Sequence, residues 1–460
     1  MAVRIRVESG RPALGGRPFK RARAVACVAV LSLLTASAAV AATGDLFPRG
    51  CVEDSGGSEG CARFAQGLAG SSSIEVSSDG RSVYVVGFDD SAIVHLRRNR
   101  RNGRLTPAGC VDDEGSAGCP RGVNGLDGAV DVAISADGRN VYTVSFRDDA
   151  LLHFKRRPRS GHLRLANCID DAGMAPVDDV CPVSADGMSG PSGIALSADG
   201  RSLYVAASVD SAIVRFQLNR GGKPFPRGCI EDDDKPFFDD CPIDRQGLAA
   251  ASDVAVRPDG RSVYVASFND DAVTWLRRNR RNGALRHRGC IDDNDPPSGP
   301  DECARSTDGL RSANSVTISP DGRYLYAGTT NELTIARFRL GRQGRPLPRG
   351  CVEDPNSAEV CQTMANGIGR AADFAIDSRG RSYYSAGVRA IAPFQRSPRS
   401  GALFGRPCIQ DVGLPPTGTT CPRTTRGLGG VGALALSPDD RWLYAAAATD
   451  GAVVTFRRQR

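Results

Sequence analysis

Cysteine is the residue type whose spacing carries the clearest chemistry in this chain. Apart from Cys27, fourteen cysteines form two interleaved series. Members of the first series lie 57 to 61 residues apart, and each is followed after 9 to 13 residues by a member of the second. A structural zinc site would favour closer CxxC-like spacing and often histidine, and neither is present. We predict seven local disulfides formed in an oxidising compartment: Cys51–Cys61, Cys110–Cys119, Cys168–Cys181, Cys229–Cys241, Cys290–Cys303, Cys351–Cys361 and Cys408–Cys421.

Residues that commonly catalyse reactions are few. The chain has only four histidines, and it lacks a phosphate-binding loop, a GxSxG nucleophile motif and an HExxH metal motif. Whether the protein is an enzyme is therefore uncertain from sequence, and no cofactor is identified. Calcium is compatible with the acidic segments and the predicted compartment, but no segment has the EF-hand spacing.

Four carboxylates occupy positions that could form a site. Asp131, Asp253 and Asp373 stand at one place in the second, fourth and sixth of the repeats described below, and Glu75 stands two residues further along in the first. Carboxylates around one opening repel each other unless a cation or hydrogen-bond donors satisfy them. We favour aspartates that cap main-chain N–H groups and a Glu75 salt bridge; a ligand or metal site is the alternative.

These residues belong to seven repeats that predict a β-propeller. Each repeat has an apolar strand, a turn such as SADGR or SPDGR, and a tyrosine three residues after that arginine. In the second repeat, four strands (a to d) are expected over 131–134, 141–146, 150–154 and 163–169. Seven such units predict an all-β, seven-bladed propeller over residues 45–460, with the tyrosines in its core.

The two ends of this region complete one repeat. The segment LFPRGCVED is a strand d without its partners, and the C-terminal segment supplies strands a, b and c without a strand d. We predict that the strand at 47–52 pairs with 453–456 and closes the ring.

The segments SPDGRYLYAG, SADGRSLYVAAS and RPDGRSVYVAS resemble the repeats of YVTN-type, lactonase-like propellers of the 6-phosphogluconolactonase type. The resemblance covers residues 45–460, and it implies lactone hydrolysis at the channel mouth through His, Arg and Glu side chains. The four histidines fall on expected outer strands or hairpins and not on strand a, which departs from that pattern. Trp-Asp and Gly-His signatures of WD40 propellers are missing.

Charge is distributed unevenly among the loops. The d–a segments that follow the first cysteines are rich in Asp and Glu, whereas the c–d hairpins hold many Arg and Lys and no acid. In a propeller these sets lie on opposite faces, which would steer charged partners. We predict a basic face that contains Arg97, Arg98, Arg100, Arg101, Arg277, Arg278, Arg280 and Arg281.

Residues 1–42 read as a targeting segment. A basic stretch precedes an uncharged run over 24–42 that ends in Ala39-Val40-Ala41, which is typical of a cleaved signal peptide; an uncleaved anchor is the alternative. These residues carry most of the net charge of +7, so nucleic-acid binding is not expected.

We therefore predict a secreted, periplasmic or cell-envelope propeller, monomeric, that binds an unidentified ligand at its acidic d–a face and channel mouth. An anionic envelope polymer or a membrane surface is the partner expected at the basic face. The alternative function is a lactone hydrolase at the channel mouth, metal-assisted if the carboxylates hold an ion.

Overall fold

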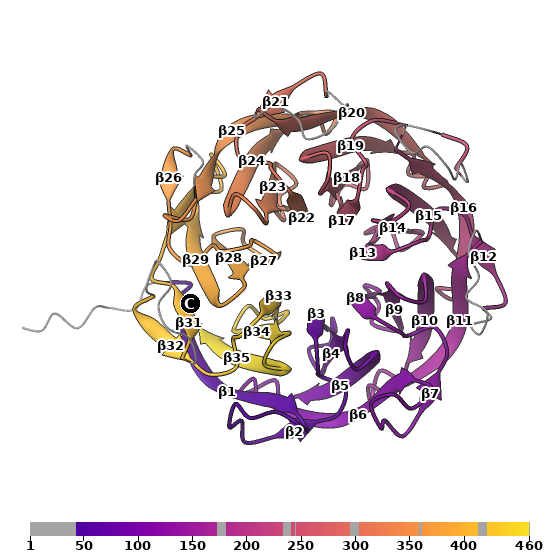
Figure 1. Ribbon diagram of the computed structural model, residues 1–460, viewed down its shortest axis with the longest axis vertical. Coiled ribbons are helices and arrows are strands. Elements are labelled where there is room, and N and C mark those ends of the chain that lie inside the picture. The colour runs from indigo at the N-terminus through magenta and orange to yellow at the C-terminus, as the bar shows by residue number, and fades with distance from the viewer. Residues whose placement is uncertain are drawn as a thin grey trace, which may run out of the picture. The chain divides into compact units, whose positions relative to one another are not determined.

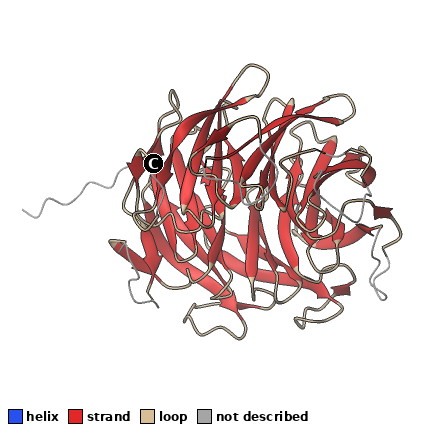
Figure 2. Ribbon diagram, turned by 45° about the horizontal axis from the view of Figure 1, so that its top comes forward, coloured by secondary structure: helices blue, strands red, loops and turns tan. Residues whose placement is uncertain are grey.

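The computed structural model describes residues 43–172, 181–232, 241–243, 245–294, 303–357, 361–412 and 421–459. Residues 41–460 form one compact unit, a ring of seven antiparallel sheets around a central opening (Figure 1). Its described residues contain strands and loops and no helix (Figure 2). The predicted seven-bladed propeller is confirmed. The predicted targeting segment, 1–42, lies outside the described residues.

Each blade begins with an inner strand a that borders the opening, followed outward by strand b. Blades are numbered 1 to 7 in the order of their inner strands. The a strands are β3 (Ser71–Val76), β8 (Ala129–Ile134), β13 (Pro191–Leu196), β17 (Ala251–Val256), β22 (Ala313–Ile318), β27 (Asp373–Ile376) and β33 (Val431–Leu436). The b strands are β4 (Ser82–Gly87), β9 (Asn140–Ser145), β14 (Ser202–Ala207), β18 (Ser262–Ser267), β23 (Tyr324–Thr329), β28 (Ser382–Gly387) and β34 (Trp442–Ala447).

Strands c and d complete the blade on the outside. The c strands are β5 (Ala92–Arg98), β10 (Ala150–Arg156), β15 (Ala212–Leu218), β19 (Ala272–Arg278), β24 (Thr334–Leu340), β29 (Ala390–Arg396) and β35 (Ala452–Arg458). The d strands are β6 (Leu105–Asp113), β11 (Leu163–Asp171), β16 (Pro224–Glu231), β20 (Leu285–Asp293), β25 (Pro346–Glu353), the pair β30 (Leu403–Gly405) and β31 (Ile409–Asp411), and β1 (Leu46–Asp54).

A short fifth strand, which the sequence did not reveal, follows the second cysteine in six blades. It pairs in parallel with the end of strand d. These strands are β2 (Phe64–Ala65), β7 (Gly122–Val123), β12 (Ser184–Ala185), β21 (Ser306–Thr307), β26 (Thr363–Met364) and β32 (Arg423–Thr425). All seven predicted disulfides are formed.

The ring closes as predicted. Strand β1 pairs antiparallel with β35, with Val52 opposite Val453 and Pro48 opposite Phe456. In Figure 1, β1 therefore lies as the outermost long strand beside β35, in the blade whose inner strand is β33. The first and last strands of the propeller complete one sheet.

The repeated tyrosines join neighbouring blades. Each is fully buried, which confirms the predicted core position, and each hydroxyl donates to a main-chain carbonyl in the c–d hairpin of the next blade. The Tyr142 hydroxyl, for example, donates to Gly222 at 2.6 Å. The last such contact before closure runs from Tyr384 to Gly44. The same arrangement holds for Tyr84, Tyr204, Tyr264, Tyr326 and Tyr444.

An arginine at the end of strand c extends this contact in five blades. Arg278 donates to the Tyr204 hydroxyl at 2.8 Å and forms an ion pair with Asp199, a turn aspartate of the preceding blade, at 3.1 Å. The equivalents are Arg98, Arg156, Arg396 and Arg458. Leu218 and Leu340 occupy this place in blades 3 and 5. The turn aspartates of the repeats thus stabilise the boundaries between blades.

Candidate functional site

The a strands line a central cavity of about 660 Å³. Asp131, Asp253, Asp373 and Glu75 all line it, and we call them the channel carboxylates. Among the described residues that line this cavity, none is a lysine, arginine or histidine. The structure therefore brings together the four residues that sequence singled out, in a cavity without basic side chains among the described lining residues.

Each aspartate of the channel bridges two neighbouring inner strands. Asp253 accepts from the N–H of Val254 in its own strand at 2.7 Å and from Val316 in blade 5 at 2.8 Å. Asp131 and Asp373 make the equivalent bonds to Ile194 and Leu434 of blades 3 and 7. The aspartates of blades 2, 4 and 6 thus cap main-chain donors, as favoured from sequence, but those of the inner strands and not of the loops.

Close approach of the strands explains why some blades have no carboxylate here. At Gly193 of blade 3, an added Cβ would lie 2.9 Å from the Asp253 Cα, too near for any side chain. Ser73 of blade 1 donates its hydroxyl to Asp131 at 2.7 Å. Space excludes a side chain in blade 3, and in blade 1 a serine serves instead as a donor to the neighbouring aspartate.

The cavity raises the pKa of every channel carboxylate. Burial is the main cause throughout, because it disfavours the charged form. Hydrogen bonds oppose burial, and the pKa is about 6 for Asp131, which has the extra bond from Ser73, about 7 for Asp373 and about 8 for Asp253. At neutral pH a cation beside these aspartates would favour their ionised form.

Glu75 differs from the three aspartates. Burial, and next the charges of Asp131 and Asp373, raise its pKa to about 8. The expected salt bridge is wrong: within the described residues, Glu75 forms no ion pair, because the other charged side chains of the cavity are all acidic. Its side chain is held in the cavity without the main-chain donors that stabilise the aspartates.

The acids that follow the first cysteines have a different role. In every repeat an aspartate three residues after that cysteine accepts the N–H of the apolar residue in the Gly-apolar step, at 2.6 to 3.2 Å. We call these the loop carboxylates: Asp54, Asp113, Asp171, Asp232, Asp293, Asp354 and Asp411. Most of the residues just before them (Glu53, Asp112, Asp170, Glu231 and Asp292) accept the N–H of the second cysteine.

This capping shows that many acids of the predicted acidic face have a structural role. The d–a and b–c loops do share one end of the blades, since Asp113 N–H donates to Ser91 and Asp148 accepts from Asp127 N–H. Many of the acids there are buried and hold the disulfide loops, and others fall in segments 173–180, 233–240 and 295–302, outside the described residues. Ligand binding by the loop face stays a prediction.

One further group of acids lies at the boundary between blades 6, 7 and 1. Carboxylate oxygens of Glu59, Asp411 and Asp450 lie within 4.8 Å of one another, close enough to hold a cation. Burial, then Asp450 and Asp411, raise the pKa of Glu59. Asp411 and Asp450 also accept main-chain N–H groups, so two of the three have a structural role without any ion.

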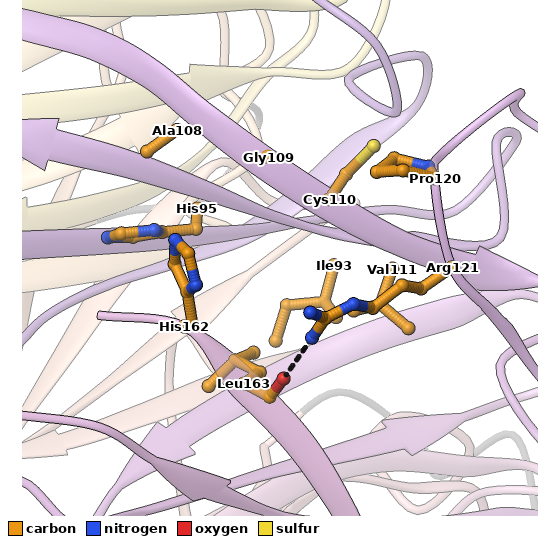
Figure 3. A pocket seen from close by; sticks show the side chains of 10 residues that line it. All are labelled: Ile93, His95, Ala108, Gly109, Cys110, Val111, Pro120, Arg121, His162 and Leu163. Carbon is orange, nitrogen blue, oxygen red and sulfur yellow. Dashed lines mark hydrogen bonds between the residues drawn. The ribbon is translucent and has the colours of Figure 1, made fainter. Parts of the chain in front are cut away.

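The histidines lie away from the channel, as the sequence predicted. His95 and His162 line a separate cavity of about 120 Å³ between blades 1 and 2, beside Cys110 and Arg121 (Figure 3). His95 is buried against Tyr84 and contacts the Ser82 hydroxyl at 3.0 Å, and burial lowers its pKa to about 4. It is therefore neutral near pH 7 and serves packing.

The predicted basic face needs one correction. Arg98 and Arg278 are buried, with 4% and 3% of their surface exposed, and each is paired with a turn aspartate of the preceding blade. They belong to the inter-blade contacts described above. The side chains of Arg97, Arg100, Arg101, Arg277, Arg280 and Arg281 are exposed.

Two findings concern the compartment. Seven disulfides are consistent with an extracytoplasmic protein. None of the described segments forms an apolar helix long enough to span a membrane.

Comparison with known proteins identifies the fold. No family model and no curated protein matches the chain. A "putative 6-phosphogluconolactonase" from Bacteroides fragilis is similar over 74% of this chain and 84% of its own, with 17% identity and a TM-score of 0.53. A periplasmic gluconolactonase from Pseudomonas aeruginosa is similar over 73% and 84%, with 17% identity and a TM-score of 0.51. Hydrazine synthase from Kuenenia stuttgartiensis is similar over 85% and 96%, with 16% identity and a TM-score of 0.53. The expected resemblance to lactonase-like propellers is confirmed at the level of the fold.

Proposed function

We propose that the protein is an exported binding propeller that takes a positively charged small ligand into its central channel from the acidic d–a face. The observation that carries this proposal is the gathering of four carboxylates in one cavity whose described lining has no basic residue. A cationic group entering this cavity would favour the ionised form of each acid and relieve their mutual repulsion.

The differences among the channel carboxylates suggest how such a ligand is held. Glu75 has no hydrogen-bond donor among the described residues, so it is the group most free to pair with an ammonium or a divalent cation. The three aspartates remain attached to the inner strands and surround it with negative potential. Low-dielectric walls focus such a field and raise the association rate of cations.

Export to the periplasm, cell envelope or medium belongs to the same proposal. The segment 1–42 has the sequence of a signal peptide, and a disulfide in every repeat suits an oxidising compartment.

Lactone hydrolysis is the second candidate. It is supported by the names of two proteins that share the fold, and Glu75 with its raised pKa has the protonation range of a general base near neutral pH. A basic group to stabilise the oxyanion is missing from the described channel lining, so we place binding first.

Calorimetric titration with spermidine and with calcium tests the proposal. We expect spermidine to bind more tightly as pH rises through the range 6 to 8, because the channel carboxylates ionise there. Glu75→Gln should weaken binding by about tenfold through loss of one close charge pair. Glu114→Gln, an exposed acid on the same face, removes an equal charge and should leave binding within about twofold, since exposed charges are screened.

Each contrary outcome has a meaning. Equal weakening by both variants would show that cations bind the face and not the channel, and the proposal would be wrong. Hydrolysis of glucono- or acyl-lactones by the wild type, lost in Glu75→Gln and kept in Glu114→Gln, would instead establish the second candidate.

A further inference from the structure

Two cavities lined with arginine lie between blades, and each is lined in part by a c–d hairpin. One of about 720 Å³ lies between blades 7 and 1, and one of about 590 Å³ between blades 4 and 5. Nothing in the channel proposal uses either of them. In the first, the lining includes Arg49, Arg101, Asn102, Arg441, Trp442 and Arg457. In the second, it includes Trp275, Arg288, Arg305, Arg342, Gln343 and Arg345.

The two cavities share some equivalent positions of the repeat. Arg49 and Arg288 each stand two residues before the first cysteine, on the outermost long strand of their blade. Facing them, the pairs Arg101-Asn102 and Arg342-Gln343 directly precede the glycine of the c–d hairpin in the next blade. These two sets of positions therefore recur in both cavities, whereas the tryptophans do not correspond, since Trp442 begins strand b and Trp275 lies in strand c.

One arginine that lines the first cavity, Arg458, pairs with Asp377, but the charge of the other arginines there is largely uncompensated. No Asp or Glu is among their described lining residues, and Arg49, Arg101 and Arg457 are exposed and form no ion pair with another described residue. Arg441 has only a distant, exposed partner, Asp439, at 3.9 Å. Guanidinium groups that converge in this way favour an anion, since each offers paired N–H donors that match a carboxylate or phosphate.

Strand c of blades 4 and 7 differs from that of blades 3 and 5 at one position near these cavities. At the fourth position of strand c, blades 3 and 5 have Arg215 and Arg337, which donate to the carbonyls of Arg227 and Arg349 and so occupy the corresponding groove. Blade 4 has Trp275 and blade 7 has Thr455 at that position. Neither residue makes the contact to strand d that arginine makes in blades 3 and 5.

Both tryptophans of the chain line these cavities. Each is largely buried, and each indole N–H lacks a hydrogen-bond partner among the described residues. Beside them, the amides of Asn102 and Gln343 offer both donors and acceptors. Arginine, amide and indole together suit a ring that carries an acid group and hydroxyls, and the volumes fall in the range of small-molecule sites.

We infer that the two cavities bind acidic sugar units of an anionic polysaccharide, which attaches the basic face of the propeller to that polymer. An acidic sugar ring matches the arginine, amide and indole groups of these cavities together, whereas a lipid phosphate matches the arginines alone, so the polysaccharide is the occupant that the lining favours.

Tryptophan fluorescence tests this inference on the protein purified after expression of the full chain. Oligogalacturonate should change the emission saturably, and maltose oligomers of equal length should not. In Trp275→Phe the remaining signal reports the 7–1 cavity, and in Trp442→Phe it reports the 4–5 cavity. With the first reporter, Arg49→Glu with Arg101→Glu should weaken binding by about tenfold or more, because two charge-assisted contacts are lost. Arg288→Glu with Arg342→Glu should do the same with the second reporter.

The matched control changes two exposed arginines of the blade 2 hairpin, Arg157→Glu and Arg159→Glu, and should retain binding within about threefold at 0.15 M salt, where distant charges are screened. Equal loss in control and cavity variants would overturn the inference in favour of general charge attraction. Binding to phosphatidylglycerol vesicles without a response to oligogalacturonate would overturn it in favour of a membrane. Thermal unfolding of each variant identifies any that fail to fold. If the double variant of one cavity does not fold, the double variant of the other cavity supplies the test.

Discussion

The loop carboxylates and the channel aspartates accept the same kind of main-chain hydrogen bond, yet they differ in their distribution. A loop carboxylate occurs in all seven repeats and completes one d–a connection, as Asp232 does for Leu248. A channel aspartate occurs only in alternate repeats and joins two blades, and Glu75 occurs once, without such a bond. In a repeat protein, an acid present in every unit maintains the unit, whereas an acid present in some of them is the better candidate for binding.

The largest effect should come from a loop carboxylate. Asp232→Ala should lower the free energy of unfolding by about 3 kcal/mol, because it leaves the buried Leu248 N–H without its charged acceptor. Urea unfolding measures this change. Asp186→Ala, an exposed acid in the preceding d–a segment, should cost less than about 0.5 kcal/mol. Equal costs at the two positions would contradict the structural role of the loop set.

An effect that is smaller per pH unit should come from the channel. The folded pKa of Glu75 is about 8, above its unfolded value, so the folded state binds a proton more strongly than the unfolded chain. Its contribution to stability is fully present below about pH 4 and is lost as pH rises to about 8. Glu75→Gln should therefore make the decline of stability across this window shallower, by less than about 1.4 kcal/mol per pH unit. The free energies of unfolding of the wild type and of Glu75→Gln are compared from pH 4 to 8. A parallel decline in the two proteins would show that Glu75 is not buried with its neighbours.

The smallest effect should come from the donor that distinguishes Asp131. Ser73→Ala removes the hydroxyl that lies 2.7 Å from the Asp131 carboxylate, so the pKa of Asp131 should rise from about 6 toward that of Asp253. The stability cost should be about 1 kcal/mol at neutral pH. Carboxyl carbon resonances of labelled aspartate, followed against pH, report the shift. An unchanged Asp131 titration would assign the difference between the two aspartates to burial alone.

Features that repeat with the period of the blade could be predicted from sequence. The cysteine pairs, the tyrosines and the partial repeats at the two ends each follow from position within the unit, and the structure confirms them. The convergence of Asp131, Asp253, Asp373 and Glu75 follows from the same reasoning.

Contacts between blades could not be predicted in this way. In the sequence, Arg98 cannot be distinguished from the other arginines of its basic hairpin, because its partners, Tyr444 and Asp439, lie near the other end of the sequence. The donors of Asp253 are main-chain groups, which every residue possesses and no sequence pattern marks. The prediction of a salt bridge for Glu75 was wrong because its described neighbours in the channel are all acidic or uncharged, which the sequence did not show.

The pairing of β1 with β35 also sets an order of events during synthesis. Strand β1 is the first of the propeller to be made, and its partner is the last, so its edge has to wait while six blades assemble. The disulfides do not wait, since each joins cysteines only 9 to 13 residues apart and can form as soon as its own d–a loop exists. Each d–a loop can thus be cross-linked by its disulfide before the ring is complete, and the pairing that closes the ring is the final step of assembly.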